Sequence, residues 1–195
     1  MTEKQTLKLY EKTGALMRGH FRLTSGLHSD VYLQSALVLQ HPEHAAALGA
    51  ALADPFRAAG ATTVLAPAIG GILVAHEVAK ALGARALFTE RENDAMALRR
   101  GFTLSAGECC LVVEDVITTG GSVREIAALV ENAGAHVAGF AALAERSESE
   151  THFPAPKYVL LRLPLVTYPP DNCPLCKQGL PLVKPGSRPE AARKC

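Results

Sequence analysis

The chain has 195 residues, of which 48% are hydrophobic and 20% charged, a composition that buries a core over most of the length and excludes a largely disordered protein. Twenty basic against 19 acidic residues give a formal net charge of +1, without the basic excess typical of proteins that bind nucleic acid. Residues 1–14 lack a signal-peptide core, and no window offers the roughly 18 apolar residues of a membrane span. We therefore expect one cytoplasmic domain, residues 1–195, that binds neither nucleic acid nor membrane.

The first forty residues predict a small N-terminal hood or arm (residues 1–40). Residues 6–18 carry apolar side chains on one helical stripe and are followed by Gly19, which would end a helix. Residues 21–34 contain two short strand-like runs around a Ser-Gly turn. That pattern predicts a hairpin.

The central part of the chain alternates between strand and helix patterns. An Ala- and Leu-rich helix begins at Pro42 and should be kinked or split at Pro55, because a proline inside a helix removes a backbone hydrogen bond. We expect strands at residues 62–66, 84–89, 109–113, 136–143 and 158–162, and helices at 72–82 and 121–133. This alternation predicts an α/β fold in residues 60–163, with a mostly parallel sheet and helices on both faces. Ligands of such sheets bind at the carboxyl ends of the strands.

The last part of the chain, residues 164–195, is rich in proline. It predicts an irregular extended tail that packs on the domain and frays from Pro189 onward. Its CPLC sequence places Cys173 and Cys176 at the spacing of half a zinc site, but Zn²⁺ normally takes four ligands, and the remaining cysteines do not supply them. His20 and His28, in the arm, lack a helical metal-binding spacing. We therefore expect a metal-free turn at CPLC and no metal ligands among the side chains.

The strongest functional signal is residues 111–124, LVVEDVITTGGSVR. An apolar strand leads into two acids, Glu114 and Asp115, and then into a loop of hydroxyl and glycine residues that opens a helix. Glycines let the backbone approach an anion, and the free N–H groups of a helix start donate to phosphate oxygens. The carboxylates suit ribose hydroxyls, which donate hydrogen bonds. We interpret the segment as a sugar-phosphate cradle; the alternative is two solvated acids before an ordinary turn.

A second anion site is expected at the PAIGG turn, residues 67–71, which follows the first core strand. Two glycines there expose N–H groups beside a helix start. The alternative is a turn whose glycines only allow close packing. The chain has no GxxxxGK[ST] loop and no GxGxxG after a strand, which disfavours nucleoside triphosphatases and dinucleotide-binding enzymes.

The cradle sequence VVEDVITTGGS resembles the phosphoribosyl pyrophosphate motif of the type I phosphoribosyltransferases. Residues 19–34, 66–83, 89–93 and 142–148 resemble, in order, segments of bacterial orotate phosphoribosyltransferases, especially the thermophile-type branch with LRRGF and a CPLC tail. The resemblance covers nearly the whole chain. It implies transfer of 5-phosphoribose from phosphoribosyl pyrophosphate (PRPP) to orotate, giving orotidine 5′-monophosphate and diphosphate in pyrimidine synthesis.

The resemblance also implies a role for individual residues. Glu114 and Asp115 would be catalytic, together with Arg99 and Arg100 of a charged lid at residues 90–102. The PRPP-binding residues would be Ala68, Ile69, Gly70, Gly71, Arg91, Glu114, Asp115, Val116, Ile117, Thr118, Thr119, Gly120, Gly121 and Ser122. The orotate-binding residues would be Tyr32, Leu33, Thr118 and Arg146. Arg146 has physical support as well, because a guanidinium meets a carboxylate through a planar fork.

The resemblance further implies Mg²⁺ and a homodimer. Mg²⁺ would enter with the pyrophosphate of PRPP and keep much of its water shell, so that no protein side chain need bind it. The lid at residues 90–102 would reach across the dimer interface, so that the active sites are shared. We expect the lid because its six charges leave it little core to bury around Met96 and Leu98.

The chain departs from many orotate enzymes at three lysine positions, which here hold Thr24, Gly70 and Glu92. Arginines of the lid can replace those lysines at the pyrophosphate. The alternatives that stay open are a purine, xanthine or uracil phosphoribosyltransferase, and a non-catalytic regulator of the same fold that senses the donor.

Overall fold

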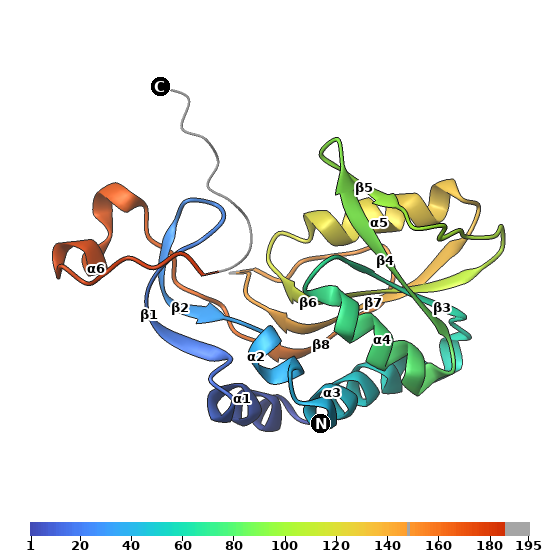
Figure 1. The fold of residues 1–195 in the computed structure, drawn as a ribbon, viewed down its shortest axis with the longest axis horizontal. Helices are drawn as coiled ribbons and strands as arrows, with labels where there is room; N and C mark the ends of the chain where they lie inside the picture. The colour runs from blue at the N-terminus through green and yellow to red at the C-terminus, as the bar shows by residue number, and fades with distance from the viewer. Residues whose placement is uncertain (148, 186–195) are drawn as a thin grey trace.

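The computed structural model of the chain describes residues 1–147 and 149–185 and is built around one six-stranded sheet (Figure 1). The strand order is β5-β4-β3-β6-β7-β8. The strands are β3 (Thr63–Pro67), β4 (Arg85–Glu92), β5 (Ala95–Leu98), β6 (Cys109–Ile117), β7 (His136–Glu145) and β8 (Lys157–Arg162). Neighbours are parallel except for the β4–β5 hairpin, which is antiparallel. The predicted mostly parallel sheet is thus confirmed.

Helices cover both faces of the sheet, as predicted. The longer ones are α3 (Pro42–Ala53), α4 (Gly71–Leu82) and α5 (Gly121–Asn132). Alternate side chains of β3 point to opposite faces, so that Val64 joins a core with α3 and α4, whereas Leu65 joins a core with α5. Pro55 splits the α3 region as expected, since α3 gives way to a 3₁₀ helix, η1 (Asp54–Ala59). Within residues 1–147 and 149–185, no helix is long and apolar enough to cross a membrane.

The N-terminal arm consists of α1 (Glu3–Lys12), a two-stranded hairpin of β1 (Leu16–Arg22) and β2 (His28–Leu33), and α2 (Ala36–Leu39). The hairpin was predicted, but the first helix is shorter than predicted. It ends at Lys12 because Gly14 turns the chain with a φ of 72°, and Leu16 already pairs with Leu33 of β2. Gly19 therefore lies inside a strand.

The tail lies along this hairpin (Figure 1). It contains η2 (Pro170–Asn172) and α6 (Pro174–Lys177). Bridges join Val183 to Phe21 of β1 and Tyr168 to His28 of β2. The fraying expected from Pro189 onward lies outside the described residues.

Candidate functional site

The PAIGG turn, at the carboxyl end of β3, meets the two acids near the carboxyl end of the neighbouring strand β6. A Cβ atom at Gly70 would lie 2.6 Å from Oδ2 of Asp115, and one at Gly71 would lie 3.4 Å from Oε1 of Glu114. The PAIGG turn therefore packs directly against the paired acids. This contact gives a physical reason for Gly70, because a side chain there would collide with the Asp115 carboxylate.

The two acids have different surroundings. The sequence predicted that the strand ends at residue 113 and that the two acids follow it. Strand β6 instead continues to Ile117, so Glu114 and Asp115 lie within the strand and pair with β7. Glu114 is buried, and its Oε1 accepts a hydrogen bond from the Asp115 backbone N–H at 3.1 Å. Asp115 is half-buried and faces the turn at Gly70. Asp115 is thus the more accessible carboxylate.

The loop after β6 leads into α5 with the geometry that an anion needs. Thr118 and Thr119 are exposed, and Gly120 precedes the helix with a φ of 75°, a left-handed conformation that favours glycine. The first turn of α5 contains no acid. The amides that open a helix lack partners within it and carry its positive end, so this turn is suited to a phosphate group.

Arg124 supports this loop from behind and was not assigned a role from the sequence. Its guanidinium donates hydrogen bonds to the backbone oxygens of Thr119 at 2.6 Å and His152 at 3.2 Å. It also lies over the Phe153 ring, 4.9 Å from the centroid. The only sequence signal for this role is the position of Arg124, one turn into the helix that follows the glycine-rich loop. Arg124 fixes the shape of the loop and adds a positive charge beside it.

Two of the residues predicted to hold orotate, Tyr32 and Arg146, come from distant parts of the chain and are electrostatically coupled. Tyr32 lies on β2 and Arg146 directly follows β7, and both are half-buried. Burial raises the pKa of the Tyr32 hydroxyl, with Arg146 opposing and Asp115 reinforcing the effect. Burial lowers the pKa of Arg146, and the charges of Tyr32 and Asp115 partly oppose this by raising it. The tyrosine, the arginine and Asp115 therefore share one electrostatic environment.

Leu33 differs from its neighbour Tyr32. Its side chain is buried in the core shared with α3 and α4, so it can reach a ligand only through its backbone. Thr118, the remaining residue predicted for orotate, is exposed in the loop after β6.

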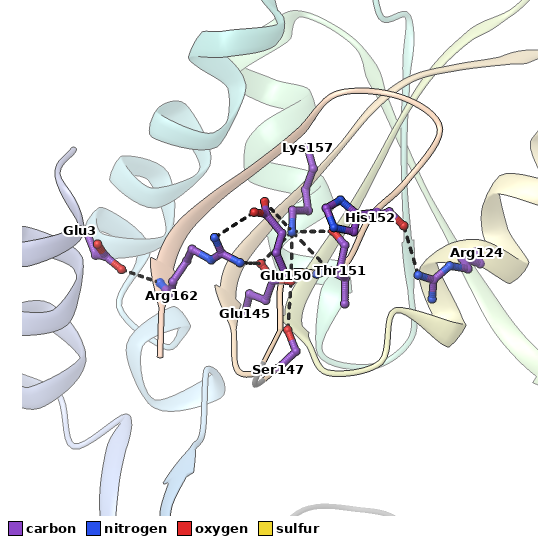
Figure 2. A network of polar contacts seen from close by, with 9 residues as sticks. All are labelled: Glu3, Arg124, Glu145, Ser147, Glu150, Thr151, His152, Lys157 and Arg162. Carbon is purple, nitrogen blue, oxygen red and sulfur yellow. Dashed lines mark hydrogen bonds and ion pairs between the residues drawn. The ribbon is translucent and has the colours of Figure 1, made fainter. Parts of the chain in front are cut away.

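Arg146 follows a residue, Glu145, that lies in a polar network (Figure 2), and its own backbone N–H donates to the Ile117 oxygen at 3.0 Å. Glu145 is 1% exposed, and its Oε2 lies 2.8 Å from Nζ of Lys157. Its Oε1 accepts a hydrogen bond from the Thr151 N–H at 2.8 Å, and Arg162 lies 3.4 Å from Oε2. Glu145 is thus paired with β8 and not with Arg146. In the part of the chain that the structure describes, no carboxylate forms an ion pair with Arg146.

The segment predicted to be a lid is an ordered hairpin, β4–β5, rather than a segment without a core. Met96 is buried in the core with α5, and Leu98 packs against it. The turn between β4 and β5 projects from the sheet (Figure 1). It contains Asn93 and Asp94, which both have positive φ angles. The expectation of little buried core is wrong, because β5 joins the edge of the main sheet.

The three arginines of this hairpin are all engaged in ion pairs. Arg91 lies 2.9 Å from Glu125 of α5. Nε of Arg100 lies 2.8 Å from Oε2 of Glu90, and Nε of Arg99 lies 3.5 Å from Oε1 of Glu92. Exposed pairs of this kind are weak, about 0–1 kcal/mol each, so a pyrophosphate can compete for these guanidinium groups.

Comparisons with known proteins show the family to which the chain belongs. Residues 35–164 match the family "Phosphoribosyl transferase domain". The chain is similar to the orotate phosphoribosyltransferase of Desulforamulus reducens, 53% identical over 96% of this chain and 98% of the relative. It is 53% identical to that of Pelotomaculum thermopropionicum, over 96% of this chain and 99% of the relative. The fold is also similar to the crystal structure of orotate phosphoribosyltransferase from Aeropyrum pernix, with a TM-score of 0.61 and 23% identity. The match covers 91% of this chain and 90% of the Aeropyrum pernix chain.

Proposed function

The chain belongs to the phosphoribosyl transferase domain family and, within it, to the orotate phosphoribosyltransferases, and from this premise we propose how its residues divide the reaction among them. The reaction moves 5-phosphoribose from PRPP to orotate and releases diphosphate, a pentosyl transfer of pyrimidine synthesis. One observation carries the assignment. Asp115 contacts the PAIGG turn and is electrostatically coupled to Tyr32 and Arg146.

This position suits the carboxylates to the ribose. The bond that breaks joins the ribose to pyrophosphate, and the bond that forms joins it to the base, so the sugar must lie between the two subsites. Asp115 and Glu114 accept hydrogen bonds from its 2′- and 3′-hydroxyls. Their negative charge also stabilises the positive charge that develops on the ring in an oxocarbenium-like transition state.

Backbone groups and arginines bind the phosphates. The amides that open α5, at residues 119–122, take the 5′-phosphate, and the Ala68–Gly71 amides take the pyrophosphate. Arg91, Arg99 and Arg100 exchange their carboxylate partners for the pyrophosphate as it leaves. An arginine stays charged at any working pH, which suits it to replace the lysines of many relatives.

Mg²⁺ fits this site as a companion of the substrate. In residues 1–147 and 149–185, no group of three or more acidic side chains gathers as a cation cage, so a hard cation would take most of its ligands from phosphate and water. Asp115 and Glu114 offer the carboxylate oxygens closest to the PAIGG turn. When bound, Mg²⁺ would offset charge on the departing diphosphate.

Tyr32 and Arg146 form the base subsite in this proposal. Orotate carries a carboxylate that uracil lacks, and the half-buried Arg146 has no carboxylate partner among the described residues. A site that pairs a buried charge with its substrate rejects an analogue that leaves the charge unpaired. The enzyme would work in the cytoplasm as a homodimer.

Kinetics with several bases test this proposal. We expect turnover with orotate and little with uracil, hypoxanthine or xanthine. Arg146→Ala should raise the KM for orotate roughly 10- to 150-fold, the loss of one charge-assisted interaction of about 1.5–3 kcal/mol, with a smaller effect on the KM for PRPP. Arg57→Ala, an exposed arginine of η1, is the matched control. Equal turnover of orotate and uracil by the unmodified protein would contradict the orotate subsite.

A further inference from the structure

A second cluster of reactive side chains lies where the β1–β2 hairpin meets the tail, in a region that the reaction proposed above does not use. His20 comes from β1 and His28 begins β2, while Cys173 and Cys176 lie at the start of α6. One ligand atom from each residue lies within 4.8 Å of the other three. Three of the four side chains are buried, and Cys176 lies at the rim.

The distances within the cluster match a tetrahedral metal site. Zinc bonds of about 2.3 Å to sulfur and 2.0–2.1 Å to nitrogen place tetrahedral ligands about 3.3 Å (N–N) to 3.8 Å (S–S) apart, with N–S near 3.6 Å. Nε2 of His20 lies 2.9 Å from Nδ1 of His28, 3.6 Å from Sγ of Cys173 and 3.7 Å from Sγ of Cys176. Sγ of Cys176 lies 3.4 Å from Nδ1 of His28. Small movements would bring all four to bonding distance of one centre.

The hydrogen bond on the far side of His20 supports a ligand role. Its Nδ1 lies 2.9 Å from the backbone oxygen of Leu180, and a carbonyl oxygen can only accept. Nδ1 therefore carries the proton, and in the neutral ring Nε2 presents a lone pair to the cluster. Histidines that bind metals are typically oriented by such a bond from the other ring nitrogen.

The chemistry of the four groups selects the metal. Two thiolates and two imidazoles in a tetrahedron are typical of Zn²⁺ rather than of Mg²⁺ or Ca²⁺, which prefer oxygen. Four protein ligands close the coordination shell, as in structural sites; catalytic zinc keeps a position open for water. Both cysteines are free thiols in the structure, so no disulfide competes for them there.

We propose that His20, His28, Cys173 and Cys176 bind one structural Zn²⁺ ion that fastens the tail to the N-terminal hairpin. This differs from the metal-free turn expected from the sequence. The ligands come in two pairs far apart in the chain, and the fold brings the pairs together.

The proposed ion would add to the support of the β1–β2 hairpin. β1 and β2 form a sheet of two strands, and such a sheet is marginal alone in water. Backbone bonds already link the tail to it, such as the 2.8 Å bond from the Arg22 N–H to the Val183 oxygen. A metal that joins the tail to the hairpin would also hold β2, the strand that carries Tyr32, in a fixed position.

Metal analysis of the full-length chain tests the proposal without any activity measurement. Protein purified without chelator should contain about one zinc per chain by elemental mass spectrometry. Cys176→Ser, at the rim of the cluster, should lose most of this zinc. Cys109→Ser, which changes a cysteine on β6 outside the cluster, should keep it.

Cobalt gives a second readout that does not depend on the folding of a variant. Adding Co²⁺ to metal-free wild-type protein should produce the strong visible absorption of tetrahedral thiolate coordination, which Zn²⁺ then abolishes by displacement. Zinc should also raise the unfolding temperature of wild type and not that of Cys176→Ser. Substoichiometric zinc with no cobalt spectrum, or a Cys173–Cys176 disulfide in protein isolated without reductant, would overturn the proposal. None of these outcomes bears on the orotate reaction.

Discussion

Adjacent acids on one strand can serve one site in different ways when their burial differs. Glu114 is buried and bonded to the backbone N–H of Asp115, so its carboxylate is held in one orientation. Asp115 is half-buried against Gly70 and electrostatically coupled to Tyr32 and Arg146. We infer that Asp115 makes the direct contact with the ribose and that Glu114 contributes fixed negative charge behind it.

Removing either charge should slow the reaction without unfolding the protein. Asp115→Asn and Glu114→Gln keep nearly the same shape but lose the charge that stabilises an oxocarbenium-like ring. Loss of one such electrostatic group commonly costs about 10²–10³ in rate, so we expect kcat to fall by that factor. Steady-state kinetics beside a thermal unfolding curve measures both effects. Asp30→Asn, an exposed acid of β2, is the control, and near-full activity of both site variants would contradict the cradle.

At the scale of elements, a buried ion pair connects the last two strands of the sheet. Glu145 ends β7 and Lys157 begins β8, and Figure 2 shows their contact with Thr151 of the segment between them. The same segment contains Arg146 and Phe153. Burial alone would raise the pKa of Glu145, but hydrogen bonds from Lys157 and Thr151 more than offset it and lower the pKa to about 2. This network therefore fixes the segment between β7 and β8, which contains Arg146 of the proposed base subsite and the His152 and Phe153 contacts of Arg124.

The depressed pKa of Glu145 predicts an acid-sensitive contribution to stability. The unfolded carboxyl has a pKa of about 4.3, so the stabilisation is complete above that value and is lost as pH falls toward about 2. A shift of this size corresponds to about 3 kcal/mol. Urea unfolding between pH 7 and pH 2 should show this loss in wild type and a shallower pH dependence in Glu145→Gln.

Glu145→Gln removes the nearer carboxylate of the buried Lys157 and leaves it the half-exposed Glu150 at 3.4 Å; breaking a buried pair commonly costs about 3–5 kcal/mol and can prevent folding. The double variant Glu145→Gln with Lys157→Met removes both charges and should stay folded, with the same shallow pH dependence. Glu131→Gln, on the exposed side of α5, is the matched control. If the double variant follows the steep pH profile of wild type, another group is responsible.

Elements with a local signal could be predicted from the sequence, whereas contacts between distant segments could not. The strands, α4, α5 and both glycine turns follow from apolar periodicity and from glycine placement. The early end of α1 and the strand β5 were missed, because pairing with another strand overrode the local pattern. Nothing local relates Tyr32 to Arg146, or His20 to Cys173. These pairs form only when the sheet and the tail are assembled.

For the whole molecule, the described chain leaves apolar surface beside the site. Ile69 in the PAIGG turn is 75% exposed, and Leu73 in the first turn of α4 is 50% exposed. Exposed apolar side chains that adjoin one another are typical of surfaces that meet a partner. Together with the projecting β4–β5 hairpin, they support the proposed homodimer, in which the hairpin of one subunit would complete the site of the other.

Hybrid dimers distinguish shared sites from self-contained ones. Arg99→Ala with Arg100→Ala disables the hairpin, and Asp115→Ala disables the cradle, so each variant alone should be nearly inactive. If sites are shared, each hybrid dimer contains one intact site, and random exchange of equal amounts should restore about a quarter of wild-type activity, as expected for a two-fold symmetric pair. Differently tagged subunits verify the exchange, and each variant mixed with itself is the control. If verified exchange restores no activity, each subunit uses its own hairpin, and Arg99 and Arg100, which follow β5, act within one chain.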